Sequence, residues 1–267
     1  MDSEATAQKA RVRAQFDTAA LEYDTGPGCF AYFGKRLVES AEILPDHRVL
    51  DVATGRGAAF FPATELLSSA GEIVGIDLSD EMVRATNAEA TRRGVPGRAQ
   101  VMDAEHLVFK DATFDRVVCG FGIMFFPDQL HALGEFQRVL KPGGLLAAST
   151  WRVAQISEIL AAMDELGMKR EQAPGWIAEQ EKLSSLLIRA GFTDVSVRIE
   201  SHSFKYVDVE EYWQQARGTG LRRTLDNLDS GDAERLLTAL RRRVCSGGAK
   251  GFSSVSTALI GLGRRQH

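Results

Sequence analysis

Apolar runs and amphipathic segments alternate along the first 150 residues of the chain. Strand-like runs occur at "RVLDVA", "EIVGID", "AQVMDA" and "FDRVVCGF", and helical spacing follows at 58–69, at 80–93 and in the segment that ends "EFQRVL". This alternation predicts a mostly parallel sheet covered by helices. Lys141-Pro142 should end the last of these helices, and Gly143-Gly144 should turn the chain into the strand "LLAASTW".

The pattern changes after Trp151. A helical stretch runs to about residue 181, and "KLSSLLIRAGFTDVSVRIES" then predicts one more helix and a strand over 195–201. A polar helical excursion covers 207–252, before "STALIGLGRR" predicts a final strand. A strand that enters from a long helical excursion at a sheet edge can run antiparallel to its neighbour, and we expect this of the last strand.

Composition and charge limit the classes of protein to consider. The 267 residues, 44% hydrophobic and 25% charged, suffice for one large α/β domain or two small ones. The longest apolar stretch, around 117–126, is too short to span a bilayer, and the polar first 16 residues do not resemble a secretory signal. We therefore expect a soluble, cytoplasmic protein. The net charge of −4 gives no electrostatic footprint for nucleic acid, and the basic run 240–244 is expected to close a helix.

The cysteines favour neither a disulfide framework nor a metal site. There are three, Cys29, Cys119 and Cys245, and they are far apart in the sequence. An odd number at wide spacing is typical of a protein in a reducing compartment, so we expect free thiols and no bound metal.

The segment "VLDVATGRGAAF" joins a buried strand to a run of small residues. Its pattern is Asp51-x-Ala53-x-Gly55-x-Gly57, without the lysine and Ser/Thr that a P-loop needs. Phe60 stands where a dinucleotide fingerprint needs a small residue, which disfavours a nicotinamide oxidoreductase. Small residues let the backbone lie against a ligand at the free N–H groups of the next helix, and Asp51 is expected to orient the loop.

Two carboxylates close the next strands. Asp77 lies 22 residues beyond Gly55, the interval at which such a carboxylate reaches a ribose diol. Asp103 ends a third strand, where it can accept from the exocyclic amine of adenine. Both residues also have structural interpretations, since Asp77 precedes a helix cap at Ser79 and Asp103 can be a turn residue. If they bind a ligand, they share the sheet edge at which open α/β sheets form their crevice.

Five motifs in a fixed order carry a resemblance to a known family. "VLDVATGRG", "GIDLSDEMV", "MDAEHLVF", "FDRVVCGFGIMFFPD" and "RVLKPGG" resemble class I S-adenosylmethionine-dependent methyltransferases, nearest the ubiquinone/menaquinone-biosynthesis type of small-molecule enzymes. The resemblance covers 16–151 and implies an α/β fold: a Rossmann-like, doubly wound sheet of seven strands, the last antiparallel, with helical lid insertions. It implies a single methyltransferase domain, 1–267, whose parts are cofactor-covering helices 1–34, a cofactor-binding core 35–151, lid elements 152–182 and 207–252, and the end of the sheet at 183–206 and 253–267.

The resemblance also implies a set of cofactor-binding residues. The small loop residues would face S-adenosyl-L-methionine, Asp77 its ribose, Leu78 and Met82 the faces of adenine, and Asp103 the adenine amine. The backbone of Ala104 would meet the ring nitrogen, the segment 119–121 would border the methionine arm, and Tyr23 would lie near the amino acid end. Ala53 stands where most relatives have glycine, and Arg56 has no assigned role. The implied set is Tyr23, Asp51, Ala53, Gly55, Gly57, Asp77, Leu78, Met82, Asp103, Ala104, Cys119, Gly120 and Phe121.

Such a site transfers a methyl group by in-line displacement to a small, apolar or aromatic metabolite, mainly through positioning and desolvation. Oxygen, carbon or nitrogen can be the acceptor atom, and the sequence does not distinguish among them. A general base is usually histidine, but the stretch after the fourth strand, where relatives often carry one, is "GFGIMFFPD". His202 and Tyr206 are the remaining candidates. The missing histidine also motivates an alternative, a cofactor-binding protein that catalyses a rearrangement or cyclisation of a natural product.

Substrate choice is expected to lie in the parts outside the cofactor scaffold. The candidates are Tyr32, Phe33, Phe125, Trp151, Tyr212, Trp213 and Arg217. Aromatic residues there suit a planar small molecule, although helix packing explains any one of them as well. We predict that Tyr212, Trp213 and Arg217 lie closer to the substrate pocket than to the adenine pocket. The expected partner is a small-molecule substrate, without nucleic acid or a membrane span, and the oligomeric state stays open.

Overall fold

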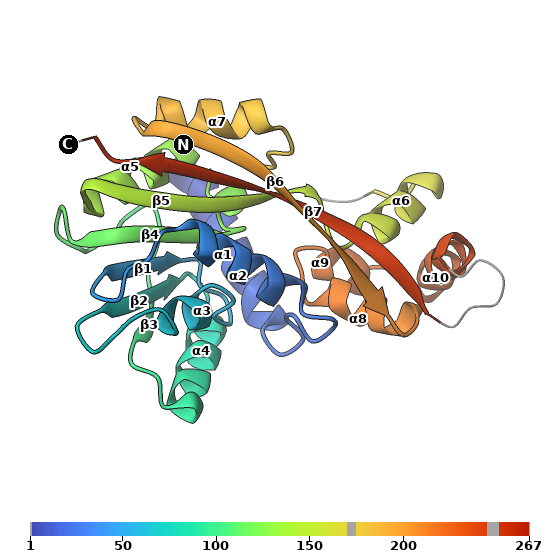
Figure 1. Ribbon diagram of the computed structural model, residues 1–267. Helices are drawn as coiled ribbons and strands as arrows, with labels where there is room; N and C mark the ends of the chain where they lie inside the picture. Colours follow the sequence, from blue (N-terminus) through green and yellow to red (C-terminus); the bar gives the residue numbers. More distant parts are fainter. Residues whose placement is uncertain (1, 170–174, 245–250, 267) are drawn as a thin grey trace.

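A seven-stranded sheet in the order β3-β2-β1-β4-β5-β7-β6 organises the chain (Figure 1). The computed structural model describes residues 2–169, 175–244 and 251–266. Strands β1 to β5 are parallel, and β7 runs antiparallel to β5 and β6, which confirms the predicted architecture. The strands are β1 (Arg48–Val52), β2 (Glu72–Asp77), β3 (Arg98–Val101), β4 (Phe114–Gly120), β5 (Leu140–Val153), β6 (Thr193–Tyr206) and β7 (Phe252–Arg264).

Helices cover both faces of the sheet, and a third group gathers beyond its end. The helices are α1 (Asp2–Ala19), α2 (Cys29–Ser40), α3 (Phe60–Thr64), α4 (Asp80–Arg93), α5 (Gln129–Val139), α6 (Ser157–Glu165), α7 (Gln180–Arg189), α8 (Val209–Arg217), α9 (Arg222–Asp226) and α10 (Ser230–Val244), with the short η1 (Ile123–Phe125). Among the described residues, no helix has the length and apolar character needed to cross a membrane.

Three clusters of buried apolar side chains fix these layers. Helices α5 and α7 pack on one face of the sheet, for example through Phe136 and Leu187, while α2, α3 and α4 pack on the other, for example through Leu37 and Phe60. The third cluster joins α6, α8 and α10 to the far ends of β5, β6 and β7, where Figure 1 shows β6 and β7 curling away from the sheet. This group of helices forms the lid over the carboxyl ends of the strands.

Local signals account for α4, which begins and ends where the sequence predicts. The hydroxyl of Ser79 accepts the N–H of Met82 at 3.1 Å and caps the helix. Acidic residues occupy its first turn and arginines its last, which suits the helix dipole, and Gly94 ends it at a φ of +65°.

Other predicted bounds need correction. Helix α3 is far shorter than the predicted 58–69, because positive φ at Gly55 and Gly57 keeps the preceding chain in turns and Leu66 and Leu67 bond only three residues back. Strand β6 extends to Tyr206 because it pairs with β7 along its whole length. The predicted helices reaching 181 and covering 207–252 lie partly outside the described residues, and Cys245 lies wholly outside them.

The predicted turn after α5 is also placed differently. The helix ends at Val139 as expected, but the following Lys-Pro-Gly-Gly segment belongs to β5 and not to a separate turn. Gly143, at a φ of +75°, donates its N–H to the carbonyl of Arg265, and Arg265 donates its own to Gly144. The glycines therefore let the start of β5 stay paired with the end of the chain.

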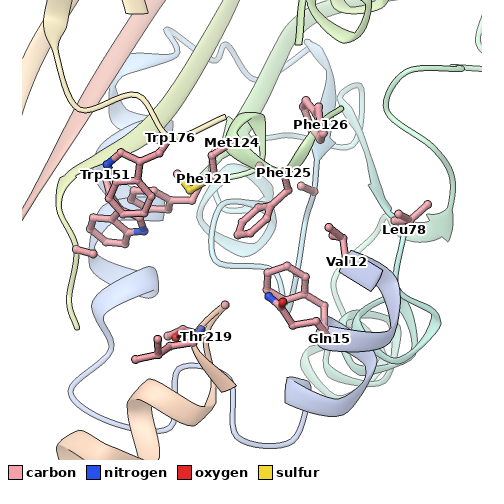
Figure 2. Close-up of a pocket in the computed structure, with 18 of the residues that line it drawn as sticks. Val12, Gln15, Leu78, Phe121, Met124, Phe125, Phe126, Trp151, Trp176 and Thr219 are labelled. Carbon is pink, nitrogen blue, oxygen red and sulfur yellow. Dashed lines mark hydrogen bonds between the residues drawn. The ribbon is translucent and has the colours of Figure 1, made fainter. Parts of the chain in front are cut away.

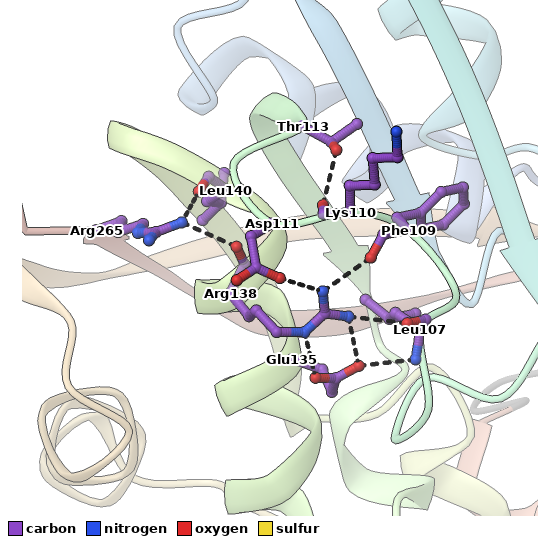
Figure 3. A network of polar contacts seen from close by, with 9 residues as sticks. All are labelled: Leu107, Phe109, Lys110, Asp111, Thr113, Glu135, Arg138, Leu140 and Arg265. Carbon is purple, nitrogen blue, oxygen red and sulfur yellow. Dashed lines mark hydrogen bonds and ion pairs between the residues drawn. The ribbon is translucent and has the colours of Figure 1, made fainter.

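An arginine network holds the connection between β3 and β4, which begins beside the site described below (Figure 3). Arg138 donates to Glu135, Asp111 and the carbonyl oxygens of Leu107 and Phe109, each at 2.7 or 2.8 Å. Arg265 donates to the carbonyl of Arg138 at 2.8 Å, which ties the end of the chain to the same point. A single guanidinium thus adds charge-assisted hydrogen bonds to a loop that Leu107 and Phe109 also anchor in the core.

Candidate active site

One cavity of about 850 Å³ lies between the carboxyl ends of the central strands, helix α1 and the lid. Ten of the thirteen predicted cofactor-binding residues line it: Tyr23, Ala53, Gly55, Asp77, Leu78, Met82, Asp103, Ala104, Gly120 and Phe121. Apart from Tyr23, which lies between α1 and α2, and Met82 of α4, they come from the ends of β1, β2 and β4 and from the segment after β3, so the parallel strands bring them to one edge of the sheet.

The three remaining residues of that set lie behind the loop and do not line the cavity. Asp51 is buried and its Oδ2 accepts from the Thr54 hydroxyl at 2.6 Å. Burial raises the pKa of Asp51 to about 7 and that of the Cys119 thiol to about 12. Gly57, at a φ of +86°, lies against the Phe61 ring where a side chain would clash. These residues shape the loop from behind, as we expected for Asp51.

Asp77 fixes the loop and faces the cavity at the same time. Its Oδ2 accepts the N–H of Gly55 at 2.9 Å, and its Oδ1 accepts the N–H of Ser79 at 2.9 Å. Burial raises its pKa. A carboxylate has about four acceptor positions, so two bonds to the backbone leave capacity for hydroxyl donors on the cavity side.

The loop backbone has the conformation that a close-lying ligand requires. Ala53 and Gly55 have φ angles of +55° and +54°, in the left-handed region. A side-chain carbon at Gly55 would contact the Tyr23 ring, 3.7 Å from its hydroxyl, so the glycine keeps this part of the cavity clear. Arg56 donates to the carbonyl of Tyr23 at 3.3 Å and so ties the loop to the N-terminal segment. The cradle fits the ribose and amino acid parts of S-adenosyl-L-methionine.

Asp103 lies beneath helix α1. The Nζ of Lys9 is 2.7 Å from its Oδ2, and the N–H of Glu105 donates to its Oδ1 at 2.9 Å. The cofactor-covering helices expected over 1–34 include Lys9, but the sequence does not single this residue out, because α1 is polar throughout and has no apolar periodicity. In the structure α1 begins at Asp2 and lies along the cavity.

The other half of the cavity is aromatic. The rings of Phe121 and Trp151 stack with centroids 3.9 Å apart and 12° between planes. Figure 2 shows them with Trp176 at one end of the cavity, Leu78 toward the other, and Gln15 of α1 along the edge. Phe121 holds a φ of +58° although it is not glycine, a strained conformation of the kind found at ligand sites. Trp176 lines the cavity as well, although it is not among the residues that the sequence predicts for the site.

The structure does not bring His202 and Tyr206 to the cavity, so the prediction that they are catalytic is not supported. His202 is exposed on β6, where its ring stacks on Tyr32 at 4.0 Å. Tyr206 is 2% exposed and packs against Tyr212 and Phe252, and burial raises its pKa. Both belong to the part of β6 that extends beyond the predicted strand at 195–201.

Only two of the predicted substrate residues reach the cavity. Phe125 and Trp151 line the cavity, but Tyr32, Phe33, Tyr212, Trp213 and Arg217 do not. Tyr212 is fully buried, with its hydroxyl accepting the N–H of Glu158 at 3.2 Å, and Arg217 pairs with Glu22 and Asp226, each at 3.3 Å. Tyr212 and Arg217 therefore contribute to the packing and ion pairs of the lid and not to the cavity lining, and the prediction that Tyr212, Trp213 and Arg217 lie closer to the substrate pocket than to the adenine pocket stays a prediction.

The lid segment nevertheless reaches the cavity through the turn that follows α8. Its lining residues are Thr219, Gly220, Leu221 and Arg223. The Thr219 hydroxyl donates to the carbonyl of Ala216 at 2.6 Å and accepts the N–H of Leu221 at 3.1 Å, which holds the turn closed. The sequence "RGTGL" is a recognisable turn signal, but nothing in it indicates a cavity.

The comparisons with known proteins agree with this geometry. A family model described as a methyltransferase domain matches residues 50–148. The chain is 38% identical over 52% of its length to aklanonic acid methyltransferase DauC of Streptomyces sp., covering 64% of that protein. It is 30% identical over 68% of its length to ubiquinone/menaquinone biosynthesis C-methyltransferase UbiE of Hydrogenovibrio crunogenus, covering 82% of that protein. The chain spans only 47 to 64% of the length of three of the curated relatives that it matches, of which DauC is one.

A solved structure shows the same fold. The YcgJ protein of Bacillus subtilis superposes with a TM-score of 0.60 at 20% identity, covering 88% of this chain and 99% of that one. At this identity the match supports the fold alone, whereas the match to the UbiE relative covers 82% of that protein at 30% identity and so shows the family. The chain belongs to the S-adenosylmethionine-dependent methyltransferases, and S-adenosyl-L-methionine is its cofactor.

Proposed function

We propose that this protein transfers a methyl group from S-adenosyl-L-methionine to a small metabolite with a planar, aromatic or apolar ring system. The observation that carries the proposal is the continuity of one cavity, with Asp77 and Asp103 in one half and the Phe121–Trp151 stack in the other. A cofactor and an acceptor can therefore lie side by side with no protein wall between them.

Each part of the cofactor half has a residue to hold it. We assign the ribose hydroxyls to Asp77, the adenine amine to Asp103, and the adenine faces to Leu78 and Met82, all of which line the cavity. Ala104 offers its backbone N–H to the adenine ring, and Tyr23 lies at the amino acid end beside Gly55. The cofactor, when bound, supplies a methyl group that is already activated by a sulfonium.

The chain contributes position and exclusion of water. Helix α1 covers the cofactor half through Lys9, and the aromatic residues of the other half can hold a flat acceptor in line with the methyl group. Phe121 borders both halves, and its ring face favours a nearby cation. Neither role needs a proton transfer, which agrees with the absence of histidine from the cavity lining among the described residues.

The names of the relatives support the class of acceptor. One is named for aklanonic acid and another for the biosynthesis of ubiquinone and menaquinone, and both are named methyltransferases. These names favour methyl transfer over the alternative of a rearrangement or cyclisation. They leave both O- and C-methylation open for this chain.

Two measurements test the proposal. Titration calorimetry should show binding of S-adenosyl-L-methionine, and incubation with methyl-labelled cofactor and a library of planar metabolites should give a labelled product. Cofactor binding without any labelled product across the library would favour the alternative. A folded protein that binds no cofactor would refute both.

A further inference from the structure

A β-bulge places one arginine at the rim of the aromatic half of the cavity. In the pairing of β5 with β7, Trp151 lies opposite Ala258 and Val153 opposite Thr257, so Arg152 is an extra residue with no partner in the ladder. Residues that follow one another in a regular strand point to opposite faces, yet Trp151, Arg152 and Val153 all line the cavity. Bulges of this kind redirect a side chain next to a binding site.

The charge of Arg152 is not neutralised within the described part of the chain. It makes no ion pair or side-chain hydrogen bond there, unlike most arginines of the protein, and it is exposed at the cavity mouth. Asp164 and Arg223, which also line this half, each interact with another part of the chain. Arg11 has no partner either, but it lies on α1 two residues from Lys9, which pairs with Asp103 in the cofactor half.

The same half of the cavity offers no good base. Among the described lining residues there is no histidine, and the one lysine, Lys9, is paired with Asp103 and Glu105. Tyr23 lies in the cofactor half, and burial raises its pKa well above the usual value. The carboxylate of Asp164, which lines this half, already takes part in an interaction within the chain. An acceptor therefore has to reach the site with its nucleophilic atom already ionised or otherwise reactive.

We infer, on the basis of the proposed function, that the acceptor is a planar aromatic acid that is anionic at neutral pH, and that Arg152 determines this specificity by pairing with its carboxylate or ionised enol. A guanidinium matches the planar geometry of such groups, and the adjacent Trp151–Phe121 stack receives the ring. For an ionised oxygen acceptor, the C–O bond forms as the C–S bond breaks. The negative charge of the oxygen and the positive charge of the sulfonium cancel, and no proton has to leave.

The test compares two flat probes that differ in one group, an anionic carboxylate or a neutral carboxamide. Anthraquinone-2-carboxylate and anthraquinone-2-carboxamide are titrated calorimetrically into the full chain saturated with S-adenosylhomocysteine, which fills the cofactor half without allowing turnover. We expect the carboxylate to bind about 10- to 100-fold more tightly than the carboxamide. Arg152→Gln should remove that preference and leave the affinity for the carboxamide unchanged, and Arg152→Lys should restore part of it. Quenching of tryptophan fluorescence gives a second readout, because Trp151 and Trp176 line the cavity.

Controls separate this inference from the proposed function. Arg189→Gln, at an exposed arginine of α7 outside the cavity, should bind both probes as the wild type does. Three outcomes would overturn the inference while the proposed function stands, all with S-adenosylhomocysteine bound. In the first the two probes bind equally, in the second neither probe binds, and in the third Arg152→Gln weakens the binding of both probes alike. If S-adenosylhomocysteine itself does not bind the folded chain, the proposed function fails first.

Discussion

The Nζ of Lys9 lies 2.7 Å from the Oδ2 of Asp103, the carboxylate that we assign to the adenine amine. Lys9 also pairs with Glu105, and the two carboxylates follow β3 while the lysine belongs to α1. This ion pair is therefore one of the contacts that hold the helix over the cofactor half. The others include the Phe16 ring against Phe125, with centroids 5.1 Å apart, and the Asp17 carboxylate, which accepts from the Ser79 hydroxyl at 2.6 Å.

The first prediction concerns the ion pairs of Lys9 with Asp103 and Glu105. Lys9→Met should loosen α1 and speed cofactor dissociation about 2- to 10-fold, the scale of one partly exposed ion pair. Hydrogen exchange over residues 2–19 should rise, and 0.5 M salt should have a similar effect on the wild type. Lys35→Met, at an exposed lysine of α2, is the matched control. Unchanged exchange and dissociation in Lys9→Met would show that other contacts hold the helix.

The second prediction concerns Asp77. Asp77→Ala should cost about 2–4 kcal/mol of cofactor affinity, since it removes charge-assisted bonds to the ribose. The change also removes the acceptors for Gly55 and Ser79, so thermal unfolding must show that the variant is folded. Asp46→Ala, in an exposed turn, is the control. Native affinity in a folded Asp77→Ala protein would remove the central residue of our cofactor assignment.

The cofactor half was predictable from sequence because it depends on local signals. Parallel strands end at one edge of the sheet, so the residues that follow β1, β2 and β3 meet there wherever the rest of the chain goes. The capped helix α4 likewise follows from Ser79 and Gly94. The ends of β6 were not predictable, since that strand is largely exposed, has no clear alternation, and is defined by its pairing with β7.

The acceptor half depends on contacts between distant residues. Tyr212 and Trp151 are both aromatic residues outside the cofactor scaffold, yet one is buried in the lid and the other lines the cavity. Nothing in the residue types distinguishes these two outcomes. Arg152 was missed because its orientation comes from a shift in the register of β5 against β7, which no single-strand pattern reveals.

The third prediction concerns the space between Ala53 and Gly122. A side-chain carbon at Gly122 would lie 2.7 Å from the Cβ of Ala53 and 2.9 Å from the Sγ of Cys119. The methyl group of Ala53 therefore has room because Gly122 carries no side chain. Gly122→Ala should destabilise the protein by about 1–3 kcal/mol, as overpacking of a core does.

A double-mutant cycle checks this explanation. Adding Ala53→Gly should recover about 0.5–2 kcal/mol of the loss in denaturant unfolding, but not all of it, because the contact with Cys119 remains. Gly134→Ala is the matched control, since a side chain there meets nothing within 4 Å and should be neutral or stabilising. Strict additivity of the two substitutions would show that Ala53 and Gly122 do not compete for space.

The last prediction concerns the pH dependence of stability through Asp51. Burial raises the pKa of Asp51 to about 7 in the folded protein from its ordinary value of 3.8, so between these values the folded state holds a proton that the unfolded state has lost. This contribution to stability is complete below about pH 4 and is lost as the pH rises through about 7. Asp51→Asn cannot ionise and does not lose this contribution. Between about pH 5 and pH 7, the free energy of unfolding of the wild type should therefore fall by about 2–3 kcal/mol relative to that of the variant. Urea unfolding at several pH values measures both proteins, and parallel curves would show that Asp51 is ionised in the folded state throughout this range.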